Sequence, residues 1–423
     1  MPRTEVVVTG LGAITPLGPD VASTWEALLA GESGIRAAVL PGREDTGLPD
    51  TVAGTMAADP ARSLPPVRAR RLDRSQQAAL VAAAEAWADA GAPQVDPDRL
   101  AAAIGTGIGG VGTLLREDDV LESAGARRVS PRTVPMLMPN AAAALVSIEY
   151  GARAGVYTPV SACSSGAEAI ALAAGLIRAG EADVVIAGGT EAATTPITVA
   201  GFARAQALST HTADPASASR PFAADRSGFV LGEGAAVLVL ESAEHARARG
   251  ARVHAVLAGA GVAADAHHVT APAPDGSGQI AAMRKALAQA GLAPERIGHV
   301  NAHATGTPVG DAAEARAIRE VFGRATVTAP KAALGHLFGA AGAIEALIAV
   351  LSVEHGAIPP TRNLTAAGGP GVDPDLGLDV VAERRDLPQD AVLSNSFGFG
   401  GQNVSLVVTR ARHHACRTAG ATP

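Results

Sequence analysis

Aromatic residues, lysine and cysteine are all scarce in this chain of 423 residues. Aromatics make up 3% of the sequence, whereas glycine alone contributes 48 residues. Because few large side chains are available, we expect the core to be packed by small side chains on closely approaching elements. The only lysines are Lys285 and Lys331, and the only cysteines are Cys163 and Cys416. Two cysteines cannot build a disulfide framework, which favours a reducing compartment such as the cytoplasm.

Excess positive charge and long apolar runs are also missing. The formal net charge is -7 at pH 7, which argues against a nucleic-acid-binding surface. No charged-then-apolar leader opens the chain, and no apolar run reaches about 18 residues without glycine or polar breaks. We therefore expect a soluble cytoplasmic protein that binds neither nucleic acid nor membrane.

Short apolar runs rich in β-branched residues alternate with segments of helical periodicity, a pattern typical of an α/β protein. The sequence predicts strands at residues 6–10, 101–105, 183–188, 235–241, 253–258, 299–302 and 404–409. It predicts helices over residues 20–30, 278–290, 311–321 and 339–353. Because the order of elements returns in the second part of the chain, we expect two fused α/β halves, although they share no sequence period.

The expected domain boundaries follow from this repetition. Residues 1–250 form the predicted N-terminal half, and residues 251–412 form the predicted C-terminal half. Residues 413–423 contain Arg, His, Thr and Pro without a periodic apolar face, so we predict a disordered tail that carries no chemistry.

Cys163 lies among small residues just before a helical run. The stretch Val-Ser-Ala-Cys-Ser-Ser-Gly at 160–166 precedes Ala-Glu-Ala-Ile-Ala-Leu at 167–172. At a helix start, the free N–H groups and the helix dipole favour thiolate, and cysteines in such places have pKa values of roughly 3.5 to 7.5. A typical intracellular cysteine is an inert buried residue. A strand–turn–helix elbow flanked by Ser and Gly instead predicts a nucleophile, with the local N–H groups as oxyanion donors.

Two histidines and a lysine occupy turns in the second half of the chain. His303 follows a predicted strand, in Asn-Ala-His-Ala-Thr-Gly-Thr-Pro, and precedes a helix that carries Asp311 and Glu314. Lys331 and His336 lie in Lys-Ala-Ala-Leu-Gly-His, which opens into a helix of small residues. The adjacent pair at 267–268 has no partners at zinc-like spacing, so we interpret it as structural.

These motifs resemble those of the β-ketoacyl-acyl-carrier-protein synthases. Cys163 in Ala-Cys-Ser-Ser-Gly, His303 in its turn, and Lys331 with His336 agree with that family in order and separation. Glycine-rich stretches at 188–192, 220–234 and 394–401 are similarly family-like, and the resemblance runs from about residue 6 to residue 409. Because His336 provides a second histidine, the likeness is to the elongating synthases of bacterial type II fatty acid and polyketide systems; priming synthases have His and Asn.

The resemblance implies a fold and a reaction. The fold is the thiolase fold, in which two pseudo-duplicated α/β halves form a layered α-β-α-β-α core. An acyl-carrier-protein thioester acylates Cys163, and a malonyl carrier then loses carbon dioxide and attacks the acyl-enzyme. Neutral His303 and His336 donate hydrogen bonds to the malonyl thioester oxygen. Lys331 orients this pair and forms a buried ion pair with Glu345. No cofactor and no metal are expected.

The resemblance also implies the residues that bind substrate. The backbone N–H groups of Cys163 and Phe399 form the oxyanion hole, and Phe399, flanked by glycines, acts as a gate. Thr305 and Thr307 contact the malonyl group. Phe397 and Gly398 belong to the substrate-binding loop, while Ile108 lines the acyl tunnel.

The expected partner is an acidic acyl carrier protein that bears acyl and malonyl thioesters. An acidic enzyme needs a local basic surface to bind it. The candidate docking residues are Arg68, Arg70, Arg71, Arg127, Arg128 and Arg204. The enzyme is expected to be a homodimer, or a heterodimer with a chain-length-factor-like subunit.

Several alternatives remain open at this stage. Ala304, Gly306 and the pair at 132–133, Arg-Thr, depart from common family residues, so the acyl chain length and the choice between fatty acid and polyketide synthesis are left open. A non-catalytic chain-length partner would lack the thiol that Cys163 provides. A thiolase would need a second catalytic cysteine near the C-terminal glycine-rich block, and residues 396–401 contain none. A catalytic subunit of a type II polyketide or polyene synthase is the remaining alternative.

Overall fold

The computed structural model describes residues 4–40, 47–48, 50–364 and 371–411. The strands of the first half are β1 (Val6–Ile14), β4 (Leu100–Gly105), β5 (Gly155–Tyr157), β6 (Val184–Glu191) and β8 (Gly234–Ser242). Those of the second half are β9 (Ala255–Ala264), β10 (His299–Asn301), β11 (Thr326–Thr328), β13 (Asp379–Val380), β15 (Ala391–Gly398) and β16 (Gln402–Arg410). Together they form an eleven-stranded sheet in the order β13-β11-β10-β15-β16-β9-β1-β8-β6-β4-β5.

The sheet is built twice on the same plan. Outward from its middle, the first half runs β1-β8-β6-β4-β5 and the second runs β9-β16-β15-β10-β11. In both halves the first two pairings are antiparallel and the next two are parallel. The halves join where β1 pairs with β9, through Val7 with Val256 and Val8 with Ala255. The predicted duplication is confirmed.

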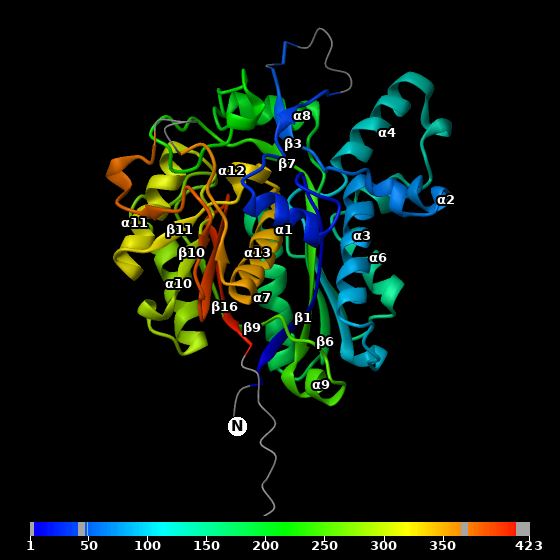
Figure 1. Cartoon of the computed structure of the whole chain (residues 1–423). Coiled ribbons are helices and arrows are strands. Elements are labelled where there is room, and N and C mark those ends of the chain that lie inside the picture. The colour runs from blue at the N-terminus through cyan, green and yellow to red at the C-terminus, as the bar shows by residue number, and fades with distance from the viewer. Residues whose placement is uncertain (1–3, 41–46, 49, 365–370, 412–423) are drawn as a thin grey trace, which may run out of the picture.

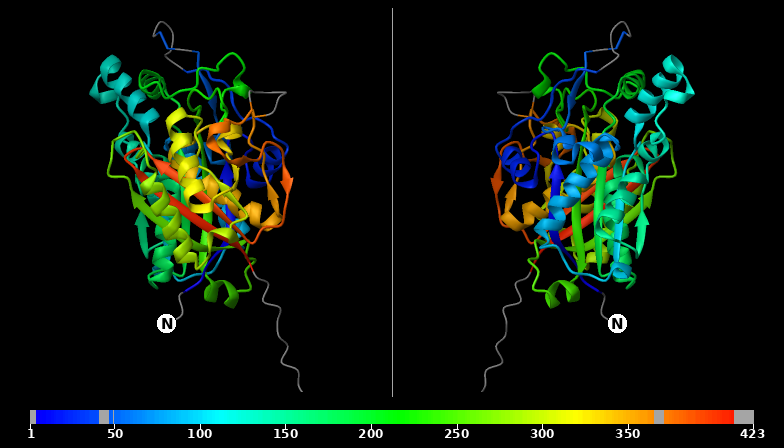
Figure 2. Two further views of the ribbon diagram at one scale, coloured as in Figure 1. Left: turned by 90° about the vertical axis from the view of Figure 1, so that its left-hand side faces the viewer. Right: turned by 90° about the vertical axis from the view of Figure 1, so that its right-hand side faces the viewer.

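Helices cover both faces of the sheet in equivalent places. The first half contributes α3 (Arg74–Asp89), α6 (Ala141–Tyr150) and α7 (Ser165–Arg178). The second contributes α10 (Ser277–Ala290), α11 (Pro308–Phe322) and α13 (Ala341–His355). In Figure 1, α7 and α13 lie in the centre, with α3 and α6 on the right flank and α10 and α11 on the left. The two side views show these outer helices over the two halves of the sheet (Figure 2). Because α7 and α13 pack between these halves, the result is the expected α-β-α-β-α layering.

Shorter helices surround this core. They are α1 (Val21–Leu29), α2 (Pro66–Ala69), α4 (Val111–Ala124), α5 (Thr133–Leu137), α8 (Pro196–Arg204), α9 (Ala243–Ala248) and α12 (Lys331–Leu334). Three small pairs of hydrogen-bonded strands complete the described structure: β2 (Arg36–Ala37) with β3 (Val52–Gly54), β3 with β7 (Leu231–Gly232), and β12 (Ala357–Ile358) with β14 (Arg385–Asp386).

Glycines let the outer helices pack directly on the strands. A Cβ atom at Gly12 of β1 would lie 2.0 Å from the Ala82 carbonyl oxygen of α3. The same contact recurs in the second half, where a Cβ at Gly261 of β9 would lie 2.0 Å from the Ala282 oxygen of α10. Since no side chain fits at these positions, the abundance of glycine and the scarcity of aromatics follow from close layer packing.

The central helices α7 and α13 cross at a second glycine pair. A Cβ at Gly166 would lie 2.8 Å from the Gly339 oxygen, and one at Gly342 would lie 2.7 Å from the Ala167 Cβ. Each glycine stands in the first turn of its helix. Their contact therefore brings the two helix starts, and the turns before them, next to each other.

The segment Phe338–His355 is the one stretch of the described residues that is long and apolar enough to cross a membrane. Within the fold 89% of it is buried, so it is the core helix α13 with the turn before it. The predicted tail at 413–423 lies outside the described residues, and the division of the chain at residue 250 stays a prediction.

Candidate active site

Cys163 lies in the turn between β5 and α7. A 3-10 turn, Ala162–Ser164, leads directly into the helix, and Ala162 has a positive φ of 50°. The Ser165 hydroxyl accepts a hydrogen bond from the Ser161 N–H at 2.9 Å and donates to the Ala162 carbonyl at 2.7 Å. These local bonds hold the elbow that the sequence predicts, and the thiol is buried, with the residue 6% exposed.

Burial raises the pKa of the Cys163 thiol to about 11. The Lys331 ammonium and the backbone N–H groups of Phe399 and Cys163 act in the opposite direction. The low pKa expected from a helix start is therefore wrong for the free enzyme, because loss of hydration outweighs the favourable partners. The resting side chain is a neutral thiol that needs a nearby proton acceptor.

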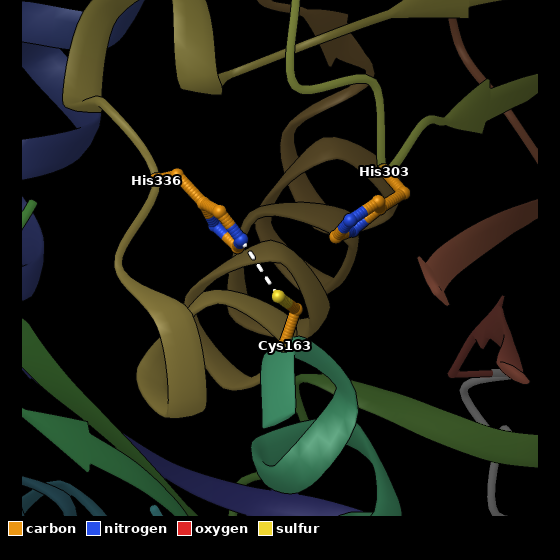
Figure 3. A group of neighbouring side chains, drawn as sticks. All are labelled: Cys163, His303 and His336. Carbon is orange, nitrogen blue, oxygen red and sulfur yellow. Dashed lines mark hydrogen bonds between the residues drawn. The ribbon is translucent and has the colours of Figure 1, made fainter. Parts of the chain in front are cut away.

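His336 provides that acceptor. Its Nε2 lies 2.9 Å from the Cys163 Sγ, and Figure 3 shows the imidazole directed at the sulfur. Two phenylalanine rings hold this imidazole: Phe338 stacks on it with ring centroids 4.8 Å apart, and Phe229 meets it edge-on at 5.5 Å. Within the part of the chain that the structure describes, the buried Nδ1 of His336 has no hydrogen-bond partner. Ring packing, together with the contact to sulfur, therefore orients His336.

His303 follows β10 and approaches the sulfur from the other side (Figure 3). Its backbone N–H and that of Ala304 donate to the two carboxylate oxygens of Glu314 on α11, at 2.9 and 2.7 Å. The His303 and His336 ring centroids are 5.5 Å apart at an interplanar angle of 85°. The turn and the helix after it thus fix the position of the second imidazole.

Lys331, in α12, determines the tautomer of His303. Its Nζ lies 3.3 Å from the His303 Nδ1 and forms a buried ion pair with Glu345 of α13. An ammonium group can only donate, so the His303 Nδ1 accepts and the Nε2 of the neutral ring carries the proton. The predicted ion pair between Lys331 and Glu345 is present in the structure.

Both imidazoles are neutral. Burial lowers the pKa of His303 and of His336 well below the ordinary range, and the positive charge of Lys331 lowers both further. Burial also raises the pKa of Glu345 to about 7, against the opposing effect of Lys331. The site therefore holds two uncharged hydrogen-bonding rings beside one buried ion pair.

A cavity of about 480 Å³ connects these groups. The Thr305 and Thr307 hydroxyls line it, 3.1 Å from each other. Five of the seven phenylalanines of the chain also line it: Phe202, Phe229, Phe338, Phe397 and Phe399. The structure thus gathers most of its phenylalanine rings around the thiol.

The loop that contains Phe399 closes one wall of this cavity. Phe399 is 40% exposed and stands between Gly398 and Gly400, the latter with a φ of 88°. A Cβ at Gly398 would lie 2.5 Å from the Ser161 carbonyl oxygen, so only glycine allows the loop to pack against the nucleophile turn. The backbone N–H groups of Phe399 and Cys163 lower the pKa of the thiol, and their role as an oxyanion hole stays a prediction.

Some predicted residues do not join this group. Ile108 is 37% exposed, in the turn after β4, and does not line the cavity.

Arg204 ends α8, next to the cavity-lining Ala205. The other candidate docking residues lie apart from α8, near α2 and after α4 (Figure 1). Arg68 pairs with Glu149 at 2.6 Å, whereas Arg70, Arg71, Arg127 and Arg128 are exposed. Their docking role stays a prediction, and the histidines at 267–268 are exposed and do not line the cavity.

Glu191 is a site residue that sequence reasoning missed. It ends β6, is fully buried, and accepts the N–H groups of Gly107 at 2.6 Å and Gly339 at 3.2 Å. Burial raises its pKa to about 7, against these hydrogen bonds. It thereby ties a turn of the first half to the turn before α13. A carboxylate at the end of an otherwise apolar strand was the available signal.

The arrangement defines a class of enzyme. A buried thiol at a helix start, two backbone N–H groups on its sulfur and an imidazole within hydrogen-bonding distance are the parts of covalent acyl transfer. A second neutral imidazole with a fixed N–H adds a donor for a negative charge that develops beside the acyl group. The chain is an acyl-transferring condensing enzyme.

Comparison with known proteins gives the family. The Beta-ketoacyl synthase, N-terminal domain, matches residues 3–246, and the Beta-ketoacyl synthase, C-terminal domain, matches residues 254–365. The chain belongs to the β-ketoacyl synthase family. Membership of this family indicates a soluble enzyme.

Relatives resemble the chain over nearly its whole length. The 3-oxoacyl-[acyl-carrier-protein] synthase 2 of Mycobacterium tuberculosis (strain ATCC 25618 / H37Rv) is 46% identical over 409 residues, 96% of this chain and 97% of the relative. The protein of the same name from Coxiella burnetii is 41% identical over 420 residues, 97% of this chain and 99% of the relative. A crystal structure of a β-ketoacyl synthase from Burkholderia phymatum STM815 is 36% identical, with a TM-score of 0.87 over 97% of this chain and 100% of that one.

Proposed function

We propose that this enzyme condenses an acyl chain held on Cys163 with a malonyl-acyl-carrier-protein, releasing carbon dioxide and a 3-oxoacyl-acyl-carrier-protein, in the cytoplasm. The names of the curated relatives support this reaction. The observation that carries it is the contact between the Lys331 Nζ and the His303 Nδ1, because it leaves a neutral imidazole with its Nε2–H available to the substrate.

The first step is acyl transfer to the thiol. The Cys163 sulfur attacks the thioester carbonyl, its proton moves to the His336 Nε2 at 2.9 Å, and that proton then goes to the departing carrier thiol. The N–H groups of Cys163 and Phe399 stabilise the oxyanion that forms in between. Since the thiol pKa is about 11, proton transfer accompanies attack rather than preceding it.

The second step is decarboxylation followed by carbon–carbon bond formation. The His303 Nε2–H donates to the malonyl thioester oxygen as the carboxylate leaves as carbon dioxide, since the His336 Nε2 gave up its proton to the carrier thiol in the first step. The resulting enolate carbon attacks the acyl carbonyl. Collapse of the tetrahedral intermediate releases the Cys163 thiolate, which takes up one proton from solvent. Thr305 and Thr307 line the approach of the malonyl group.

The two steps can be separated by substitution. With acyl and malonyl carrier proteins supplied together, Cys163→Ala should form no 3-oxoacyl product but should still decarboxylate the malonyl carrier. His303→Ala should still accept the acyl group but should decarboxylate about 10²- to 10³-fold more slowly, as expected for loss of one oxyanion donor. The exposed His267→Ala serves as the control. Absence of 3-oxoacyl product with the unaltered enzyme would sink the proposal.

A polyketide or polyene synthase subunit is the second candidate. Similar structures include the ishigamide ketosynthase/chain length factor, 33% identical with a TM-score of 0.86, over 97% of this chain and 100% of that chain. A type II PKS acyl-carrier protein in complex with its ketosynthase bound to the hexaketide is 29% identical with a TM-score of 0.87, over 97% of this chain and 100% of that chain. On this chain β5 is an edge strand with exposed Val156 and Val160 beside it, a surface suited to a second subunit of the same fold.

Oligomeric state and reconstitution decide between these candidates. A homodimer that is active alone supports fatty acid-type elongation, whereas activity only after addition of a chain-length-factor-like subunit supports the polyketide alternative. The carrier surface can be tested in the same assay. Arg204→Glu, at the cavity rim, should raise the KM for the acyl carrier protein with little change in kcat, because a rim charge acts on encounter with the partner.

A further inference from the structure

The thiol–imidazole cluster, Cys163 with His303 and His336, contains the ligand types of a zinc site. One ligand atom from each residue lies within 4.8 Å of the other two, and all three residues are buried. Zinc binds sulfur at about 2.3 Å and imidazole nitrogen at about 2.0–2.1 Å, which places ligands of a tetrahedral ion about 3.6 Å apart. Small side-chain rotations could bring these atoms around an ion, and the cavity gives it access.

The hydrogen-bonding partners around the cluster are the opposite of those found around a bound zinc ion, because donors stand where a zinc site has acceptors. A metal-bound histidine nearly always donates its other ring N–H to a carboxylate, a carbonyl or water. The other nitrogen of His303 instead faces the Lys331 ammonium at 3.3 Å, which can only donate. If the His303 Nε2 bound a metal, the neutral ring would carry its proton on Nδ1, and two donors would face each other in a buried site. The other ring nitrogen of His336 has no acceptor among the described residues either.

We propose that Lys331 keeps the thiol–imidazole cluster free of transition-metal ions. Its hydrogen bond occupies the Nδ1 lone pair of His303, so the proton stays on the nitrogen that faces the thiol and no lone pair is offered there. Its positive charge, held in place by Glu345, also opposes a divalent cation beside it.

This protection preserves the nucleophile. Coordination of a metal would expel the thiol proton to solvent and leave a metal–thiolate bond in which the sulfur pair is no longer available to a thioester. A synthase without such protection would be inactivated by any free Zn²⁺ that reached its cavity. Lys331 is therefore a residue that excludes metal as well as one that positions His303.

The test is metal binding, measured without substrate. The variant Lys331→Gln/Glu345→Gln removes both charges and gives the His303 Nδ1–H an acceptor of similar size. Zn²⁺ content after gel filtration, and the thiolate-to-metal absorption of Co²⁺, are compared for this variant and the unaltered enzyme. We expect one ion per chain in the variant, bound about 10- to 100-fold more tightly than by the unaltered enzyme. Addition of Cys163→Ser should abolish the Co²⁺ absorption.

Control variants distinguish metal bound at this cluster from metal bound at the protein surface. The pair at 267–268 is exposed and can bind metal weakly, so His267→Gln/His268→Gln is introduced into both proteins and should change neither result. Tight stoichiometric Zn²⁺ binding to the cluster of the unaltered enzyme would overturn the proposal. So would a folded charge-free variant, confirmed by its melting transition, that binds no better. If that variant does not fold, Lys331→Met/Glu345→Leu provides a second charge-free protein. Because no step requires turnover, these outcomes are independent of the proposed reaction.

Discussion

In each half of this enzyme a 3-10 turn precedes the central helix, but the residues in and beside the two turns have different chemical roles. Before α7, the 3-10 turn Ala162–Ser164 holds Cys163; before α13, the equivalent turn Phe338–Ala340 has Gly339 in the second place. The first residue of each turn has a positive φ, 50° at Ala162 and 45° at Phe338. Duplication supplied two matching helix starts, one of which carries the nucleophile while the other carries groups that act on it.

The second half supplies the groups that move or hold protons. His303, Lys331, His336 and Glu345 all come from it, and Cys163 alone comes from the first. The halves meet at the crossing of α7 and α13, so the reaction depends on an interface between two scaffolds and not on either one alone. Substitutions that alter one half or the contact between halves can test this division of labour.

The largest effect should come from removing the charge that the second half buries. Lys331→Met leaves Glu345 buried without its partner, and we expect a loss of about 3–5 kcal/mol in the free energy of unfolding. Lys331→Met/Glu345→Leu should recover most of that stability, because apolar replacement of both partners is often neutral. Condensation should stay impaired in both, since His303 loses the donor that sets its tautomer. Denaturant unfolding and product assays give the two readouts, and full activity in the double variant would contradict the positioning role.

A second test addresses an ion-pair contact between the halves away from the site. His254 donates a hydrogen bond from Nδ1 to Glu354 of α13 at 2.8 Å and another from Nε2 to Asp89 of α3 at 2.8 Å. Despite burial, these two carboxylates raise the pKa of His254 to about 9. Protonated His254 therefore stabilises the folded state. This contribution to the free energy of unfolding is complete at pH values below about 6.5, the pKa of histidine in the unfolded chain, and it is lost as the pH rises to about 9.

The expected size of that loss is on the order of 3 kcal/mol. It can be measured as the unfolding free energy at intervals between pH 6 and pH 10, with His254→Gln as the matched variant. The free energy of unfolding should fall more steeply with rising pH in the unaltered enzyme than in the His254→Gln variant. Parallel profiles for the two proteins would show that His254 does not hold the halves together through its charge.

The crossing of the central helices gives the third test. Gly342→Ala would place a Cβ 2.7 Å from both the Ala167 Cβ and the Ser396 Oγ, so we expect a destabilisation of about 1–3 kcal/mol. Gly175→Ala, on the exposed face of α7 with no atom within 4 Å of its Cβ, is the control and should stabilise by about 0.4–1 kcal/mol. The melting temperature should therefore fall for Gly342→Ala and rise for Gly175→Ala. If both variants shifted it in the same direction, close packing at the helix crossing would be contradicted.

The smallest effect concerns the ring packing that orients His336. Phe338→Leu removes the stacked ring at 4.8 Å but leaves an apolar side chain. Aromatic pairs contribute about 0.5–1.5 kcal/mol beyond buried area, so we expect acylation of Cys163 to slow by roughly 2- to 13-fold. The same substitution should hardly change decarboxylation, in which His303 retains its fixed N–H. Single-turnover acylation and malonyl decarboxylation distinguish this result from a general loss of structure.

Local features of the fold and the site could be predicted from sequence. The strand at 253–258 and the helix at 339–353 appear as β9 and α13, because apolar periodicity depends on near neighbours. The predictions omitted α3, although its Asp73 cap and small-residue face were present in the sequence. Cys163, His303 and His336 could be singled out because each lies in a turn of small residues next to a helix, a setting that is distinctive in sequence.

Non-local features could not be predicted in this way. Ile108 is partly exposed and does not line the cavity beside Cys163, so its expected place in the acyl tunnel stays a prediction, because a turn's sequence does not say which way its side chains face. Glu191 and the Phe229 ring act on partners more than 80 residues away in the chain. No periodicity or short motif relates such positions.

The sequence by itself determined which reactive groups exist and where turns present them: one thiol before a helix, one histidine after a strand, a second histidine before a helix, and one lysine where lysine is rare. Only the tertiary structure decided their chemical state. Burial raised the thiol pKa that a helix start alone would lower, and it made both imidazoles neutral. The contact between the Lys331 Nζ and the His303 Nδ1 then determines that the Nε2 of His303 carries the proton. Protonation depends on desolvation and on charges brought close by folding, and these are properties of the packed chain.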